Sequence, residues 1–284
     1  MPFIQANDIK IFYRVFQNGV ESATINPALS TMIVLHGAPG LIDHQIEVEA
    51  WKGFSNTVQV IFPDLRGCGQ TEDGDLDQWS LKLCSEDLHA FCQKLGIHKP
   101  ILAGISSGGF IIMHYLDKYA DYPRGIILCN TEARKSPVER KKVFLRVGTA
   151  KAAEAAAIFD ANPTNLEKSN AFFETCVPYF SKKPFSLMAP VKTNTFLWLK
   201  NSKEWSEIDF RENLKKIQCP TLYLSGTDDP NHPLASAIEA VNCIPKAFVH
   251  FDPIQDAGAP VYQDQPNAFE KRVSNFLALI KDNS

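Results

Sequence analysis

The sequence predicts an α/β protein with a doubly wound, mostly parallel sheet, and three observations support that fold class. Short runs rich in β-branched residues alternate with longer segments of helical periodicity along most of the chain. These runs are almost wholly apolar, which is typical of strands buried on both faces of a parallel sheet. The alternation stops in the middle of the chain, where helical patterns follow one another, and this predicts an inserted helical segment.

The predicted strands each have a short apolar centre. They cover residues 31–35, 58–62, 100–103, 125–129, 221–224 and 247–251. Helical patterns follow several of them, at residues 81–95, 108–119 and 266–280. Because parallel strands end at one edge of their sheet, the residues directly after these strands are expected to form the functional site.

The interrupted region spans residues 132–215 and is predicted to be a helical cap on a core made of residues 1–131 and 216–284. Residues 151–157 and 166–177 have helical character within it. Prolines divide the region into short helices, at Pro163, Pro178, Pro184 and Pro190. The chain of 284 residues is therefore expected to hold one main core with one insertion.

The composition is that of an ordinary soluble globular protein, with 45% hydrophobic residues, 21% charged residues and a net charge of -3. Basic residues are scattered, so we expect no nucleic-acid partner. No apolar run reaches the roughly 18 residues that span a bilayer, and the first residues lack the pattern of a signal peptide. We therefore expect no membrane partner and a cytoplasmic location, while the oligomeric state is left open.

The cysteines are seven in number, widely spaced and without a C-x-x-C pair. An odd, scattered set argues against both a disulfide framework and a zinc site. We expect reduced, mostly buried thiols, with no metal and no cofactor.

The strongest local pattern is Gly104-Ile105-Ser106-Ser107-Gly108, which lies between a predicted strand and a predicted helix. A G-x-S-x-G turn is so sharp that small residues must flank the serine, whose hydroxyl is then exposed as a nucleophile. Ser106 fits this frame, whereas Ser107 would need a glycine at position 105. The alternative is ordinary tight packing of a strand against a helix.

The turn His36-Gly37-Ala38-Pro39-Gly40 follows the first predicted strand. Its glycines let the backbone approach a ligand, and we expect Gly37 to contact substrate. The backbone amides of Ala38 and Ser107 are predicted to form an oxyanion hole, while His36 is expected to be structural. A plain strand-end turn is the alternative.

The acid and the base of a serine site should follow the last two strands. Asp229 is the predicted acid, with Asp228 or a plain Asp-Asp-Pro turn as alternatives. A histidine is expected after Gly258, yet the residue there is Ala259, which offers no proton acceptor.

Together these motifs resemble the α/β-hydrolase superfamily, and more narrowly its proline-iminopeptidase-like serine hydrolases. The similar segments are residues 36–40, 64–71, 104–108, 226–229 and 258–266, which match H-G-G-P-G, D-x-R-G-x-G-x-S, G-x-S-x-G, the acid loop and the G-H-x6-P ending. The resemblance implies the α/β-hydrolase fold with a helical cap at residues 132–215. It also implies a triad of Ser106, Asp229 and position 259, with Ala38 and Ser107 as oxyanion donors.

This sequence departs from the family pattern at two positions. Ala38 replaces a glycine, a mild change if only its amide is used, whereas Ala259 replaces the general base. Loss of a triad member lowers turnover by several powers of ten while substrate binding can survive. We therefore interpret the chain as an engineered, inactivated His-to-Ala variant of a working hydrolase, with natural loss of the histidine as the alternative. Other histidines, including His232 and His250, are expected to be packing or surface residues rather than substitutes.

The predicted substrate is a small-molecule carboxylic ester, lactone or amide, cleaved through an acyl-enzyme. Aromatic residues of the cap, among them Phe172, Phe173 and Trp198, are expected to line its pocket, unless they only form the core of the cap. A prolyl aminopeptidase is one alternative, for which cap carboxylates at Glu132, Glu167 and Glu174 could hold a free amino group, unless they only face solvent. A non-catalytic ligand-binding member is another, and lyase or isomerase chemistry a third.

Overall fold

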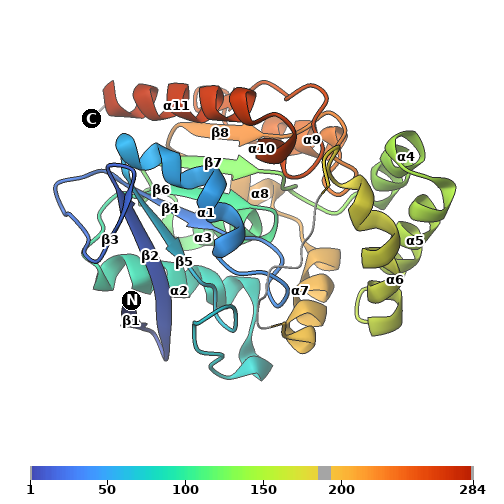
Figure 1. Cartoon of the computed structure of the whole chain (residues 1–284), viewed down its shortest axis with the longest axis horizontal. Coiled ribbons are helices and arrows are strands. Elements are labelled where there is room, and N and C mark those ends of the chain that lie inside the picture. The colour runs from blue at the N-terminus through green and yellow to red at the C-terminus, as the bar shows by residue number, and fades with distance from the viewer. Residues whose placement is uncertain (1, 185–192, 283–284) are drawn as a thin grey trace.

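The computed structural model describes residues 2–184 and 193–282. Its sheet has the strand order β1-β2-β5-β4-β6-β7-β8-β9, with β3 paired to β2 (Figure 1). The strands are β1 (Phe3–Ala6), β2 (Ile9–Gln17), β3 (Val20–Ser22), β4 (Thr31–Leu35), β5 (Gln59–Pro63), β6 (Ile101–Ile105), β7 (Gly125–Cys129), β8 (Thr221–Leu224) and β9 (Val249–Phe251). The pairs from β5 to β9 are parallel, which confirms the predicted fold class.

The parallel part of the sheet follows the apolar runs closely. β4, β7 and β8 have the predicted bounds, and every residue of β4, β5, β6 and β7 is buried. The sequence analysis assigned no strand to residues 3–22, where the structure has three antiparallel strands. These strands mix polar with apolar residues, and β1 and β3 are largely exposed, so they lack the continuous apolar run that identified the others.

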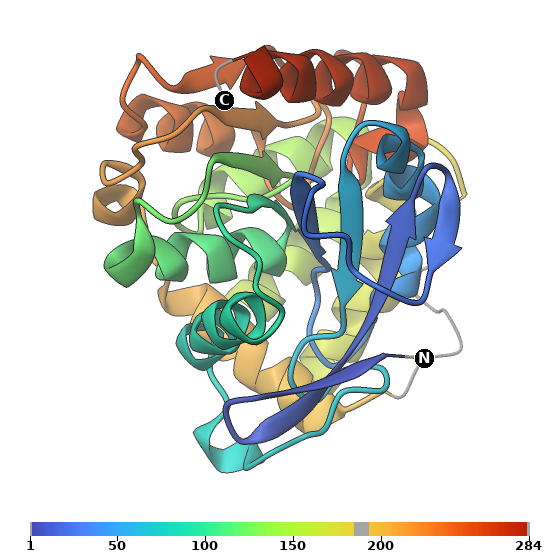
Figure 2. The ribbon, with the colours of Figure 1, turned by 90° about the vertical axis from the view of Figure 1, so that its left-hand side faces the viewer.

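Helices cover both faces of the sheet, as Figures 1 and 2 show. One hydrophobic cluster joins the sheet to α2 and α3, and a second joins the opposite face to α1 and α11. In the second cluster the ring of Trp51 packs edge-on against Phe269 at 4.9 Å between centroids. The helices outside the predicted cap are α1 (Gln45–Trp51), α2 (Leu81–Lys94), α3 (Ser107–Tyr119), α9 (Leu234–Cys243), α10 (Val261–Asp264) and α11 (Pro266–Asp282), and α8 (Arg211–Leu214) lies at the end of the predicted cap, before β8.

Between β7 and β8 the described chain is mainly helical. It forms α4 (Pro137–Val147), α5 (Ala150–Ala161), α6 (Leu166–Cys176) and α7 (Thr195–Glu207), and α4, α5 and α6 lie together at one end of the molecule (Figure 1). Pro163 follows α5 and Pro178 lies in the short 3-10 helix after α6, whereas Pro190 lies outside the described residues. The exact division into core and cap stays a prediction.

Candidate active site

The turn between β6 and α3 has the strained geometry that a nucleophile elbow requires. Ser106 has φ 51° and ψ -119°, a conformation that side-chain-bearing residues rarely adopt. A Cβ on Gly104 would lie 2.5 Å from the Gly108 carbonyl oxygen, and one on Gly108 would lie 2.3 Å from the Leu35 carbonyl oxygen. Both glycines are therefore required by close backbone contacts, and the predicted turn is present.

The two predicted oxyanion donors lie beside Ser106. Ala38 has φ 40° in the loop after β4, and Ser107 begins α3; both line the same cavity as Ser106. Within the described residues, neither backbone N–H donates to a protein acceptor. A Cβ on Gly37 would lie 2.8 Å from the Cβ of Ser106, so this glycine lets the loop pass close to the serine. The role of the two amides stays a prediction.

His36 is enclosed in the protein, as expected for a structural residue. Its Nε2 accepts a hydrogen bond from the Leu65 amide at 3.2 Å, which leaves Nδ1 to donate to the Gly37 carbonyl at 2.8 Å. Burial lowers the pKa of this imidazole, so His36 is neutral and holds the two loops together.

The two aspartates after β8 point in different directions. Asp229 is fully buried: its Oδ1 accepts from the amides of Asn231 at 2.8 Å and His232 at 2.9 Å. Its Oδ2 accepts from Asn130 at 2.8 Å, and burial raises the pKa of this carboxyl. Asp228 instead forms ion pairs with cations at the surface. The structure thus favours Asp229 over Asp228 as the inward acid.

Position 259 also reaches the cavity that contains Ser106. Ala259 lines that cavity, and its amide donates to the Phe180 carbonyl at 2.6 Å. Asn130 donates through one amide group both to Asp229 and to the Gly258 carbonyl, at 3.3 Å for the latter, so the acid loop and the 259 loop are neighbours. Ala259 thus brings a methyl group to this cavity, where the sequence analysis expected an imidazole, and the roles of Asp229 and position 259 stay a prediction.

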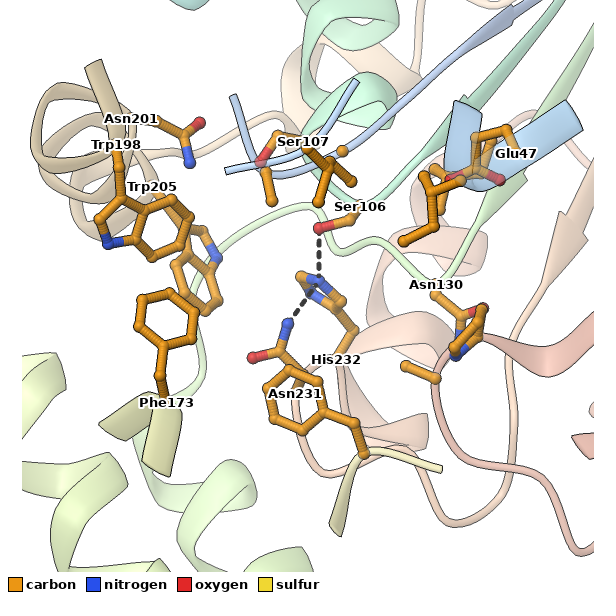
Figure 3. A pocket seen from close by; sticks show the side chains of 18 of the residues that line it. Glu47, Ser106, Ser107, Asn130, Phe173, Trp198, Asn201, Trp205, Asn231 and His232 are labelled. Atoms are coloured by element: carbon orange, nitrogen blue, oxygen red, sulfur yellow. Dashed lines mark hydrogen bonds between the residues drawn. The ribbon is translucent and has the colours of Figure 1, made fainter. Parts of the chain in front are cut away.

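His232 is the residue that the sequence analysis placed wrongly. We expected it to be a packing or surface residue, but its Nε2 lies 3.2 Å from the Ser106 Oγ (Figure 3). The ring is 2% exposed and also contacts Asn231, whose Nδ2 is 3.1 Å from the same Nε2. Its place in the sequence could have identified it, because His232 lies in the loop after β8, at the carboxyl edge of the sheet.

Glu132 was also misjudged, since a solvated helix face was the alternative considered for it. It is fully buried after β7, its Oε1 accepts from Trp205 Nε1 at 2.8 Å, and the same oxygen lies 3.4 Å from His232 Nδ1. Glu167 and Glu174 are exposed, as that alternative predicted. A buried carboxylate beside a buried imidazole therefore forms part of this site.

A mainly apolar cavity of about 90 Å³ surrounds Ser106 (Figure 3). The predicted substrate contacts all line it: Gly37, Phe172, Phe173 and Trp198. Trp205, another of the cap aromatics, lines the cavity as well, and Asn201 from α7 is a lining residue that the sequence analysis did not single out. Phe172 also stacks on Phe159 at 4.6 Å, so the cap aromatics serve both the cap core and the cavity.

Glu47 on α1 brings a second buried carboxyl to the cavity wall. It is 1% exposed and accepts hydrogen bonds from Trp51 Nε1 at 3.2 Å and from Tyr262. Burial raises the pKa of Glu47 to about 7. It is therefore largely protonated in mildly acidic solution.

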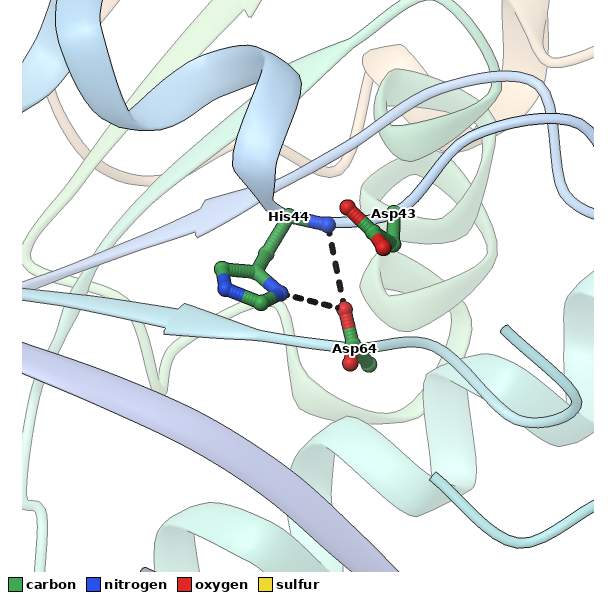
Figure 4. A group of neighbouring side chains, drawn as sticks. All are labelled: Asp43, His44 and Asp64. Atoms are coloured by element: carbon green, nitrogen blue, oxygen red, sulfur yellow. Dashed lines mark hydrogen bonds and ion pairs between the residues drawn. The ribbon is translucent and has the colours of Figure 1, made fainter. Parts of the chain in front are cut away.

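A group of ligand-type side chains lies under the loop after β5, where Asp43, His44 and Asp64 come within 4.8 Å of one another (Figure 4). His44 Nδ1 contacts Asp64 Oδ1 at 2.6 Å, and the Gln70 amide donates to Asp64 Oδ2 at 2.8 Å. Both oxygens of Asp64 are thus engaged by the protein, and we assign the group a structural role in that loop.

The described helices include none that is long and apolar enough to cross a bilayer. The cysteines are free thiols, and six of the seven are buried.

Comparisons with known proteins identify the family to which the fold belongs. The model of the alpha/beta hydrolase fold family matches residues 30–257, most of the chain. This chain belongs to the alpha/beta hydrolase family. A proline iminopeptidase of Saccharolobus solfataricus is 26% identical over 246 residues, which cover 78% of this chain and 74% of that protein.

Solved structures show the same fold at low sequence identity. An esterase from Thermogutta terrifontis superposes with a TM-score of 0.67 at 23% identity and 98% coverage of both chains. An enol-lactonase from Burkholderia xenovorans LB400 gives a TM-score of 0.69 at 21% identity, with 98% of this chain and 100% of that one covered. This alpha/beta hydrolase therefore has structural neighbours that differ in the substrates they are named for.

Proposed function

We propose that this alpha/beta hydrolase is a cofactor-independent serine hydrolase that cleaves small carboxylic esters, lactones or amides through an acyl-enzyme on Ser106. The observation that carries the proposal is the strained elbow, which presents the Ser106 hydroxyl to a mainly apolar cavity. The backbone amides of Ala38 and Ser107 line the same cavity and have no acceptor among the described residues. These amides would stabilise the negative charge that develops on the carbonyl oxygen during attack. Attack also requires a group that accepts the serine proton.

Position 259 supplies no such group. The hypothesis that Ala259 inactivates the chain holds only if no other base reaches Ser106. The contact between His232 and Ser106 argues against that condition, because an imidazole nitrogen at 3.2 Å is within the reach of a general base. We therefore expect the chain as it stands to turn over substrate.

The cavity favours a small, largely apolar acyl group. Aromatic rings of the cap form one wall, and Asn201 adds a polar group whose Oδ1 has no hydrogen-bond partner within the described residues. That oxygen could accept a hydrogen bond from a hydroxyl or amide of the substrate. An ester or lactone with one hydrogen-bond donor fits this lining.

Prolyl aminopeptidase activity is the second candidate, supported by the similarity to proline iminopeptidases. Such a substrate has a free amino group that must be held by an acid. Of the carboxylates considered, Glu132 is buried behind His232 and Glu167 and Glu174 are exposed. Glu47 remains as an acid on the cavity wall.

The test combines a covalent probe with a substrate panel. We expect a fluorophosphonate to label Ser106 and p-nitrophenyl esters of short acyl chains, or small lactones, to be hydrolysed, with Ser106→Ala as the control. Faster cleavage of a prolyl anilide than of every ester would select the second candidate. Absence of both labelling and hydrolysis in the unmodified chain and in Ala259→His alike would overturn the proposed hydrolase.

A further inference from the structure

We infer that His232 is the general base of Ser106 and that Glu132 is the residue that positions it. The catalytic residues would then be Ser106 and His232, supported by Glu132 in place of the Asp229 and position 259 of the family pattern. The inference rests on the proposed function. It replaces the expectation that the chain lacks a base.

His232 is held firmly where a base must be. Its Nε2 is 3.2 Å from the Ser106 Oγ, and its own backbone amide donates to Asp229 at 2.9 Å. The ring lies against Trp205, 5.7 Å between centroids, and against Phe110, at 6.1 Å. Because the ring is buried between these contacts, it can reach the serine with little loss of side-chain freedom during catalysis.

Its hydrogen bonds identify the tautomer that catalysis needs. The Arg140 guanidinium, which is itself buried, donates to Asn231 Oδ1 at 2.9 Å. The other end of that amide, the NH2 group, therefore faces His232 Nε2 at 3.1 Å and donates to it. Nε2 must then be the acceptor nitrogen, while the ring proton is on Nδ1. The Asn231 amide and the Ser106 hydroxyl share the single lone pair of Nε2, which takes the Ser106 proton when the serine attacks.

Nδ1 faces the buried carboxyl of Glu132. His232 Nδ1 lies 3.4 Å from Glu132 Oε1. Within the described residues, neither Nδ1 nor Glu132 Oε2 has a hydrogen-bond partner, so both remain available for a bond between the two side chains. Trp205 donates to Glu132 Oε1 at 2.8 Å and so fixes the carboxyl group. Contacts of this kind are often long without substrate and shorten when the imidazole becomes charged. Glu132 can thus stabilise the cation that forms when His232 takes a proton.

Asp229 is not arranged for that role toward His232. Both of its oxygens accept hydrogen bonds from other groups, namely the amides of Asn231 and His232 and the side chain of Asn130. Its carboxylate therefore fixes the backbone of the loop that carries His232, and the ring nitrogen that needs an acid turns to Glu132 instead.

The order of the strands explains how Glu132 and His232 can take the roles that Asp229 and position 259 have in the family pattern. In the family pattern the acid follows the strand equivalent to β8 and the base follows the strand equivalent to β9. Here Glu132 follows β7 and His232 follows β8, so each role lies one strand closer to β6, which carries Ser106. Because these parallel strands are neighbours and end at one edge, both side chains reach the same serine.

The proposed reaction is balanced by water. Ser106 Oγ forms a bond to the substrate carbonyl carbon while its proton passes to His232 Nε2. The bond from that carbon to the leaving oxygen or nitrogen then breaks, and the leaving group takes the proton from Nε2. A water molecule next attacks the acyl carbon while its proton passes to Nε2. The bond between the acyl carbon and Ser106 Oγ then breaks, Oγ takes the proton back from Nε2, and the carboxylic acid product leaves.

The first experiment compares the unmodified chain with His232→Ala, using fluorophosphonate labelling and hydrolysis of p-nitrophenyl acetate. We expect both rates to fall by about 10³-fold or more in the variant, and added imidazole to restore part of the loss. His98→Ala, at an exposed histidine, is the matched control and should keep its activity. His232→Gln, which retains a polar side chain of similar length, gives the same comparison if the alanine variant fails to fold.

The outcomes separate the inference from the proposed function. If the unmodified chain is active and the hydrolysis rate of the His232 variant is within about threefold of it, the role of His232 is overturned but the serine hydrolase proposal is not. Activity that appears only in Ala259→His would also overturn it, while the serine hydrolase proposal would stand. A chain inactive toward both reagents, with Ala259→His equally inactive, would overturn the proposed function itself.

The second experiment tests Glu132 as a positioning residue. Glu132→Gln should lower kcat by about 10²-fold or more with little change in KM, because the neutral amide cannot stabilise the imidazolium. Glu132→Asp, which keeps the charge, should recover part of kcat. Equal loss in both variants together with a raised KM would indicate a merely structural carboxyl and would contradict the assigned role.

Discussion

The loop after β8 (the β8 loop) and the loop after β9 (the β9 loop) both reach the cavity of Ser106, yet only the β8 loop brings an imidazole to it. The position of the β9 loop does not depend on the side chain of residue 259, because the Gly258 amide donates to Asp264 at 2.7 Å and the Gly258 carbonyl accepts from Asn130. In the β8 loop, backbone bonds to Asp229 serve the same purpose. The comparison teaches that backbone contacts determine the position of each loop, independently of which side chain the loop presents to Ser106.

Removal of the nucleophile, which both loops face, should have the largest effect. Ser106→Ala should lower hydrolysis by about 10³-fold or more, because neither loop can compensate for a missing attacking oxygen. Steady-state rates on the responsive ester, with circular dichroism to confirm folding, measure this. Full activity in Ser106→Ala would show that Ser106 is not the nucleophile and that the two loops do not face the reacting group.

Asn130 joins the two loops, so its loss should affect both at once. It donates to Asp229 at 2.8 Å, accepts from the Val261 amide at 3.0 Å and has φ 44°, which asparagine tolerates better than alanine. Asn130→Ala should lower the free energy of unfolding by about 3 kcal/mol. Urea unfolding measures the change, and a loss below about 1 kcal/mol would show that the loops are fixed independently.

Glu47 supports the segment after β9 through its hydrogen bond with Tyr262, and its contribution to the free energy of unfolding should depend on pH. The pKa of its carboxyl rises from 4.5 to about 7 on folding. The folded state therefore binds more protons between these values, so stability falls as pH rises from 4.5 to 7. Relative to Glu47→Gln, the unmodified chain should lose about 3 kcal/mol between pH 4 and pH 8. A pH-independent difference in urea unfolding would contradict this.

Asp228 gives the smallest effect, because it is the member of the β8 loop that faces outward. Its ion pairs with Lys182 and Arg146 lower the pKa of its carboxyl despite partial burial. Asp228→Asn should cost about 1 kcal/mol or less and leave ester hydrolysis within about twofold. A kinetic loss comparable to that of Glu132→Gln would identify Asp228 as the acid after all.

Local patterns predicted the part of the fold and site that local chemistry determines. The apolar runs of β4, β7 and β8 predict strands from their own residues, without reference to the strands beside them. The glycines around Ser106 indicate a turn that involves only a few consecutive residues. Antiparallel β2 was missed because its burial depends on the strands it pairs with. Its alternation of apolar and polar residues is interrupted by Phe12 and Phe16, which lie on the same face as Lys10 and Arg14.

The pairing of His232 with Glu132 could not be predicted in the same way. The two residues meet because β7 and β8 are adjacent and because Trp205 from α7 holds the carboxyl, and each condition is a tertiary contact. Both residues do follow predicted strands at the carboxyl edge. A search of all polar residues at that edge, rather than of the family positions alone, would have included them.

The bond from the Ala259 amide to the Phe180 carbonyl links the segment after α6 to the rim of the cavity. Any movement that lifts this segment away must first break that bond and expose the amide to solvent. Deuterium uptake at the Ala259 amide would therefore report how often Phe180 separates from the loop after β9, and a ligand that is tightly bound in the cavity should slow that uptake.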